Sequence, residues 1–173
     1  FVQEGFCGQG AQAVPIVTFG NRSFDDALKE LCETLEANGF HTVAAAAIVA
    51  QHAFAAALAA GRPDDADLQR IRAFAHALAI DIERCPKPPQ PISVPGRSPI
   101  GPYYTPLGVD GKPAKFLKAK PKTDQARCLV CGLCAAVCPM GAISRQDPAV
   151  VEGVCTKCQA CITRCPQRAK YFD

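Results

Sequence analysis

The hydrophobic pattern in the first part of the chain predicts a strand followed by a helix. Residues 13–20 form a short apolar run that ends in a glycine, which is typical of a buried strand. Ser23 and Asp26 have the spacing of a capping box, so we expect the helix to begin at Ser23 and to end at Asn38-Gly39. Apolar residues fall on one face of that helix: Phe24, Ala27, Leu28, Leu31 and Leu35.

A second apolar run and a second helix follow. Residues 42–50 contain both alanines and β-branched residues, so their periodicity leaves helix and strand open. Residues 61–63, Gly-Arg-Pro, break the chain, and the acidic residues after them suit the first turn of a helix. The apolar stripe of that helix consists of Leu68, Ile71, Ala75, Leu78 and Ile82. The order strand, helix, apolar run, helix predicts an α/β fold with a parallel sheet, half of a doubly wound one.

Residues 85–121 interrupt this pattern with ten prolines and four glycines. Such a stretch cannot continue a helix and is typical of an extended linker. It carries six Lys or Arg residues against one acidic residue, whereas residues 1–84 carry six against eleven. This contrast favours docking of the linker on the acidic first part, and we expect Tyr103 and Tyr104 to be packing anchors.

The last quarter of the chain contains one cysteine motif twice. Each copy reads C-x2-C-x2-C-x3-C-P, and the second copy lies 27 residues after the first. This spacing is the one by which bacterial-type ferredoxins hold 4Fe-4S clusters, with the fourth cysteine of each copy serving the other cluster. The predicted ligands are Cys128, Cys131, Cys134 and Cys165 for one cluster, and Cys155, Cys158, Cys161 and Cys138 for the other.

Two other uses of the cysteines fit the motif less well. Tetrahedral zinc usually takes two separated cysteine pairs, which fits two identical four-cysteine runs poorly. Disulfides would leave one of the eleven cysteines unpaired. The formal net charge is +3, but two oxidised cubanes at about −2 each would bring the loaded chain to about −1. Balancing the cluster charge is therefore a simpler interpretation of Arg127, Lys157 and Arg164 than a nucleic-acid site.

Neither export nor membrane insertion is expected. The stretch from residue 41 to 61 is long enough to span a bilayer, but Gln51 and His52 interrupt it and alanine adds little hydrophobicity. Residues 1–10 contain Glu4 and no basic segment of a signal peptide. A reducing, cytoplasmic setting suits a chain with this many thiols.

The segments PIVTFGNRSFDDALKEL, GFHTVAAAAIVAQHAF and AAGRPDDADLQRIRAF resemble the second half of the flavodoxin-like domain in flavodoxin–ferredoxin fusion proteins (ferrodoxins) of anaerobic bacteria. PIGPYYTPLGVDGKP, KPKT, CPMGAI and AKYFD continue the resemblance over nearly the whole chain. It implies that residues 42–50 are a strand. It also implies that the start of the flavodoxin-like domain, with its phosphate-binding loop, is missing. Gly20, Asn21 and Arg22 would be the remainder of a flavin site, or else a plain strand-to-helix turn.

The expected organisation is therefore half of a flavodoxin-like domain (1–84), a Pro-rich basic linker (85–121) and an α+β ferredoxin-type domain with two clusters (122–173). The first functional hypothesis is electron transfer to redox partner proteins through two 4Fe-4S clusters. The alternative is an iron–sulfur flavoprotein oxidoreductase, if the intact protein binds FMN. A third hypothesis makes the clusters purely structural. Whether the chain is an enzyme stays open, and the sequence makes no prediction of its oligomeric state.

Overall fold

The computed structural model describes residues 2–85, 90–108, 110–113 and 119–172. The chain divides into two compact units, Phe1–Tyr104 and Thr105–Asp173. Each unit has its own elements and is described by itself.

The strands of the first unit pair in parallel. β2 (Ile16–Phe19) lies beside β4 (Ala46–Val49), with Ile16 opposite Ala46 and Phe19 opposite Val49. β1 (Gln12–Ala13) pairs in the same sense with β3 (His41–Thr42). Pro15 lies between β1 and β2, where a residue without an N–H interrupts the ladder at no further cost. The apolar run at 42–50, which periodicity left open, therefore contains strand and no helix.

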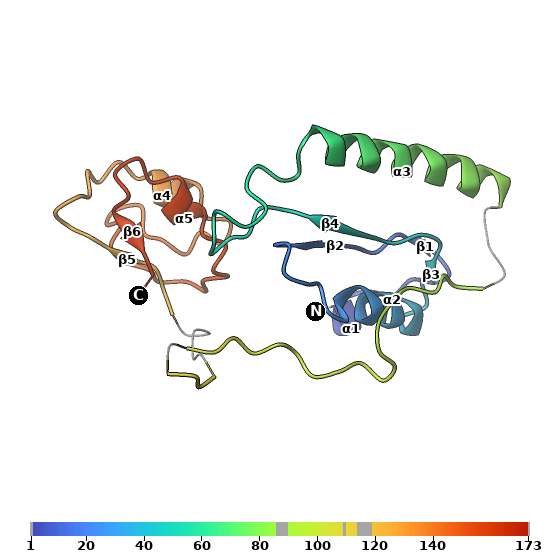
Figure 1. Cartoon of the computed structure of the whole chain (residues 1–173). Helices are drawn as coiled ribbons and strands as arrows, with labels where there is room; N and C mark the ends of the chain where they lie inside the picture. The colour runs from blue at the N-terminus through green and yellow to red at the C-terminus, as the bar shows by residue number, and fades with distance from the viewer. Residues whose placement is uncertain (1, 86–89, 109, 114–118, 173) are drawn as a thin grey trace. The chain divides into compact units, whose positions relative to one another are not determined.

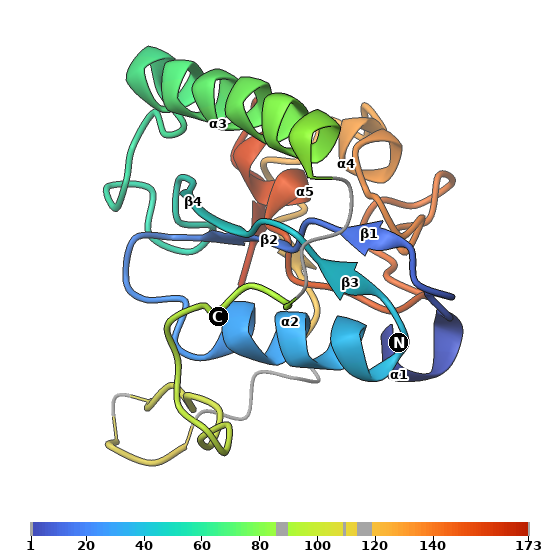
Figure 2. The same ribbon diagram turned by 90° about the vertical axis from the view of Figure 1, so that its right-hand side faces the viewer.

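Two longer helices lie on opposite sides of these strands (Figures 1 and 2). α2 (Ala27–Ala37) buries Leu28 and Cys32, and burial raises the pKa of the Cys32 thiol. α3 (Asp65–Arg84) buries no apolar residue completely, and Leu68 at its start is 37% exposed. The short helix α1 (Val2–Gly5) is joined to the end of α2, since the Asn38 side chain donates to the Val2 carbonyl oxygen at 2.6 Å.

The predicted start of α2 is wrong. Its N-cap is Asp26 rather than Ser23, and the Asp26 side chain forms no capping hydrogen bond. Ser23 Oγ instead accepts a hydrogen bond from the Asp25 N–H at 2.9 Å, in a turn that precedes the helix. The carboxylate of Asp26 is not available for capping because it binds residues from the Pro-rich segment.

That Pro-rich segment lies partly within the first unit. Asp26 accepts hydrogen bonds from Arg97 N–H at 3.0 Å, Arg97 Nε at 2.8 Å and Gly101 N–H at 3.0 Å. The two backbone N–H groups, together with the Arg97 guanidinium, lower the pKa of Asp26. Tyr103 donates to Glu30 at 2.5 Å, and Arg22 lies 4.0 Å from the centre of the Tyr104 ring. Both tyrosines are mainly exposed, so polar and cation–π contacts anchor them rather than burial.

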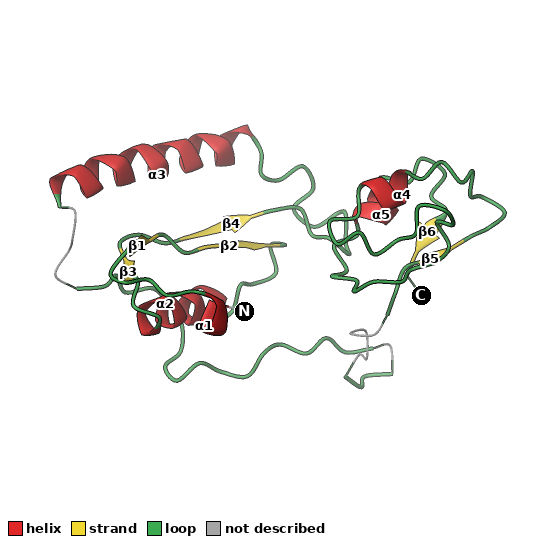
Figure 3. Cartoon of the chain, turned by 180° about the vertical axis from the view of Figure 1, so that it is seen from behind, coloured by secondary structure: helices red, strands yellow, loops and turns green. Residues whose placement is uncertain are grey.

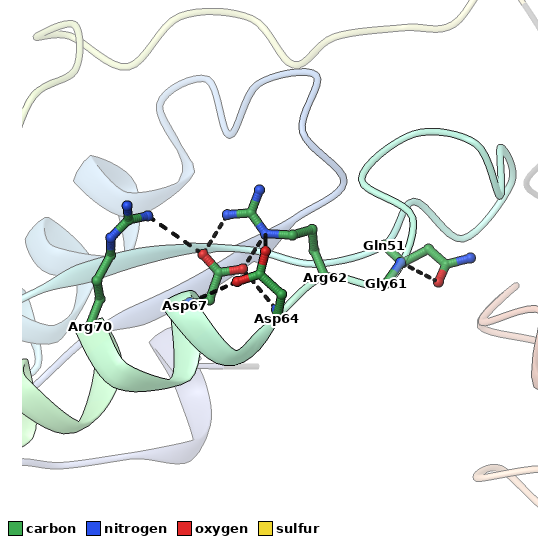
Figure 4. A network of polar contacts seen from close by, with 6 residues as sticks. All are labelled: Gln51, Gly61, Arg62, Asp64, Asp67 and Arg70. Atoms are coloured by element: carbon green, nitrogen blue, oxygen red, sulfur yellow. Dashed lines mark hydrogen bonds and ion pairs between the residues drawn. The ribbon is translucent and has the colours of Figure 1, made fainter.

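A capping box does exist, at the start of α3 (Figure 4). Asp64 accepts from the Asp67 N–H at 2.9 Å, and Asp67 accepts from the Asp64 N–H at 3.0 Å. Asp67 also binds Arg62 Nε and Nη2 through both of its oxygens. The Arg62 side chain and the Asp64 N–H lower the pKa of the buried Asp67 carboxyl to about 2.

Loops and short elements make up the second unit (Figure 3). β5 (Lys122–Thr123) pairs antiparallel with β6 (Lys170–Tyr171), and the helices are α4 (Leu133–Ala136) and α5 (Ala160–Thr163). Its core contains Ala135, Ile143 and Cys161, with Cys134 and Cys138 packed against them. Because this core is so small, a bound group would contribute an important share of the unit's stability.

The mixed helix-and-strand class, with small parallel sheets, is confirmed. Each parallel sheet has two strands among the described residues, so the flavodoxin-like assignment of 1–84 stays a prediction. In the described ranges, no helix is long and apolar enough to cross a membrane.

Candidate metal centres

The 27-residue repeat of the cysteine motif is also a repeat of backbone conformation. Left-handed residues recur at this offset: Val130 and Lys157, Gly132 and Gln159, and Gly141 and Arg168. The helices α4 (133–136) and α5 (160–163) obey the same offset. Residues other than glycine rarely have positive φ, yet Val130 and Lys157 both do, and Gln159 and Arg168 do so where the first copy has glycine. The two motifs therefore fold into two copies of one loop-and-helix unit.

The first cavity of this unit is lined by four cysteines. They are Cys128, Cys131, Cys134 and Cys165. The first three come from one loop and the start of α4, whereas Cys165 follows α5. Leu129, Leu133 and Ala169 supply apolar walls, and Lys170 is the charged residue of the lining.

The second cavity repeats this arrangement with the motifs exchanged. Cys155, Cys158, Cys161 and Cys138 line it. Cys138 follows α4 and thus belongs, in sequence, to the first motif. Met140, Ile143 and Val151 form apolar walls. The structure hence brings together the same two sets of four cysteines that the spacing predicted, and their role as ligands stays a prediction.

Burial and hydrogen bonding shift the pKa of three of these thiols. Burial raises the pKa of Cys134, and it raises that of Cys161 to about 11. Burial also acts to raise the pKa of Cys165, but the N–H groups of residues 167–170, Ala169 first among them, outweigh it and lower that pKa. Without a cation, the buried thiols favour the neutral form. A bound metal would deprotonate them, because a coordinating thiol loses its proton.

The residues present fit an iron–sulfur cluster. Each cavity has four sulfur donors, and backbone N–H groups point at their sulfurs from Ala142 to Cys138 and from Ala169 to Cys165, both at 3.3 Å. Such N–H···S contacts help to set the reduction potential of an iron–sulfur cluster. Gln159 lines the second cavity, and its buried Nε2 has no hydrogen-bond partner among the described residues. A sulfide or thiolate in the cavity would accept from this amide.

In the part of the chain that the structure describes, no three His, Cys, Asp or Glu side chains form a group that would hold a single metal ion. A four-iron cluster needs no such group, since each cysteine binds its own iron. All eleven cysteines are described and are free thiols, so no disulfide competes for them.

The candidate flavin loop follows β2. A Cβ atom on Gly20 would lie 2.5 Å from His52 Cδ2, so the His52 ring already fills the space beside this glycine. Asn21 has φ 63°. Arg22 pairs with Asp25 at 2.6 Å and covers the Tyr104 ring. The one basic side chain of the loop thus already has partners in its own unit, and a flavin role stays a prediction.

The sequence interpretation missed Lys170 and Gln159, although a signal was present. Both depart from the repeat, since Lys170 stands 27 residues after Ile143 and Gln159 stands 27 residues after Gly132. Departures from internal symmetry mark the positions where two otherwise equal sites differ.

In a comparison with known protein families, residues 121–144 match the 4Fe-4S binding domain. These residues contain the first cysteine motif. The chain thus contains a 4Fe-4S binding domain, which indicates iron–sulfur electron transfer. Searches of curated proteins and of solved structures found no match.

Proposed function

We propose that this chain transfers electrons through two 4Fe-4S clusters with crossed ligands. Cys128, Cys131, Cys134 and Cys165 hold one cluster, and Cys155, Cys158, Cys161 and Cys138 hold the other. The observation that carries the proposal is the pair of four-cysteine cavities, each lined by three cysteines of one motif and the fourth of the other.

The packing between the cavities suits transfer from one cluster to the other. Cys134 of the first set and Cys138 of the second set pack against one buried cluster, which itself contains Cys161 of the second set. The two sets therefore share one small core. Bound clusters would supply one-electron chemistry, and the chain orients their ligands and places N–H donors at the sulfurs.

In this proposal, residues 122–173 form the ferredoxin-type domain of a cytoplasmic flavodoxin–ferredoxin fusion protein, and redox proteins are its partners. Residues 1–84 are its flavodoxin-like half-domain, and 85–121 connect the two. A second candidate is an iron–sulfur flavoprotein oxidoreductase. The Gly20–Arg22 loop favours it, since this loop follows a parallel strand, where open α/β sheets bind ligands.

Metal analysis after anaerobic purification tests the main proposal. We expect about eight iron and eight sulfide per chain, with visible absorption that bleaches on reduction. About two zinc per chain without visible absorption would contradict it. If the clusters are present but cannot be reduced, their role is purely structural.

A further inference from the structure

Lys170 is a buried cation in the wall of the first cavity. Its side chain belongs to β6, is 3% exposed and donates from Nζ to the Pro148 carbonyl oxygen. It lines the cavity together with Cys128, Cys131, Cys134 and Cys165. Among the described residues, no Asp or Glu forms an ion pair with it.

Such a charge needs an anionic neighbour. A lysine ammonium has three donors, and burying it without a counter-charge is costly. Burial raises the pKa of the Cys134 thiol of the first set and of the Cys161 thiol of the second. The positive charge of Lys170 acts on both pKa values in the opposite direction. A thiolate-bound cluster in the cavity would supply the missing negative charge.

The repeat shows where the second cavity differs. Ile143 occupies the position equivalent to Lys170, is 5% exposed and lines the second cavity. That cavity has its own lysine, Lys157, but this side chain is partly exposed, so water screens its charge. Gln159 adds a neutral donor there, which acts more weakly than a buried full charge.

We propose that Lys170 makes the two sites unequal by raising the reduction potential at the first cavity, so that the first electron resides there. The inference rests on the proposed two-cluster function. One electron from a one-electron donor changes the cluster and its four thiolates from a total charge of about −2 to about −3, with no proton taken up. A buried cation stabilises the more negative state, and it does so most where it lines the cavity.

The test is a redox titration of the whole, cluster-loaded chain with dithionite, followed by electron paramagnetic resonance. In Lys170→Met, we expect the higher of the two potentials to fall, with the partition of the first electron shifting about tenfold or more, which is 59 mV for a one-electron couple. Lys170→Arg keeps the charge and should keep the split. The matched control, Lys157→Gln, should change the higher potential little, because it removes a screened charge from the other cavity.

Ile143→Lys is the reciprocal variant. It adds a cation at the equivalent position, so the lower potential should rise and the split should narrow. An unchanged higher potential in Lys170→Met, with all iron retained, would overturn this inference and leave the two-cluster function standing. If Lys170→Met loses iron, Ile143→Lys decides: a split between the two potentials as wide in Ile143→Lys as in the wild type would overturn the inference. A wild type without eight iron per chain would instead refute the proposed function.

Discussion

Arg62 binds both carboxylate oxygens of Asp67 and so joins the loop after β4 to the first turn of α3. Gln51 supports this loop, since its side chain accepts from the Gly61 N–H at 3.4 Å and donates to the Ala56 carbonyl oxygen at 3.3 Å. α3 buries little apolar surface, so its position depends on this polar junction more than on packing.

The Asp67 carboxyl should make stability depend on pH. Its pKa is lowered to about 2 in the folded chain, against 3.8 for an unperturbed Asp carboxyl. A lowered pKa contributes stability above the unfolded value and loses it as pH falls through the folded one. We expect Asp67→Asn to be less stable than the wild type at pH 5 and above, and the difference to vanish between pH 4 and 2. Urea unfolding followed by circular dichroism measures it, and a difference independent of pH would contradict the expectation.

Asp64 should contribute to the same helix end by capping alone. Asp64→Ala removes the acceptor for the Asp67 N–H, which costs about 1 kcal/mol of unfolding free energy. Asp65→Ala is the matched control, because Asp65 lies in the same turn without forming the capping box. Its effect should be limited to the smaller helix-dipole contribution. Equal losses in the two variants would show that the cap is not formed.

Asp26 should hold the part of the Pro-rich segment around Arg97 and Gly101 against α2. Asp26→Ala removes the acceptor of three hydrogen bonds from Arg97 and Gly101. We expect trypsin to cleave after Arg97 several times faster in this variant, because local opening becomes easier. Glu33→Ala, which removes an exposed ion pair with Lys29 on the same helix, should leave the cleavage rate unchanged. A rate unchanged in Asp26→Ala would contradict the anchoring.

FMN should bind this chain weakly or not at all. The His52 ring fills the space beside Gly20, and Arg22 already has partners, so the loop offers little to a phosphate. A fluorescence titration with FMN, and with riboflavin as the control without phosphate, measures this. Tight, stoichiometric binding of FMN in preference to riboflavin would show that the loop is a flavin site.

The elements of the first unit were predictable where local pattern decides them. The apolar runs at 13–20 and 42–50 contain the strands, and the stripe after Gly61 lies on α3. The N-cap of α2 was not predictable from neighbours, because Arg97 takes the Asp26 carboxylate from 71 residues away in the chain. The register of the parallel strands was not predictable for the same reason, because it depends on two strands that lie far apart in the sequence.

In the candidate site, spacing predicted how the cysteines group, because a strict repeat forces equivalent loops. The burial of Lys170 could not be predicted from the sequence, for a physical reason. A lysine in a sequence is ordinarily exposed, and its burial became visible only once β6 had placed it against the cavity.

Crossed ligation is the central claim, and the paired variants Cys138→Ala and Cys165→Ala test it most directly. Cys138→Ala should leave the site of Cys128, Cys131, Cys134 and Cys165 with four ligands and deprive the other site of one. Cys165→Ala should do the reverse. Both variants should lose some stability, because cluster binding and folding of this unit are coupled.

Electron paramagnetic resonance of each reduced variant, with iron counts, assigns the damage. Lys170→Met, made in each variant, identifies the remaining cluster by whether its potential falls. The account predicts that Cys138→Ala retains an intact cluster whose potential responds to Lys170, and that Cys165→Ala retains one that responds much less. Loss of the Lys170-sensitive cluster in Cys138→Ala, with the other cluster intact, would mean that each motif binds its own cluster and would contradict the account.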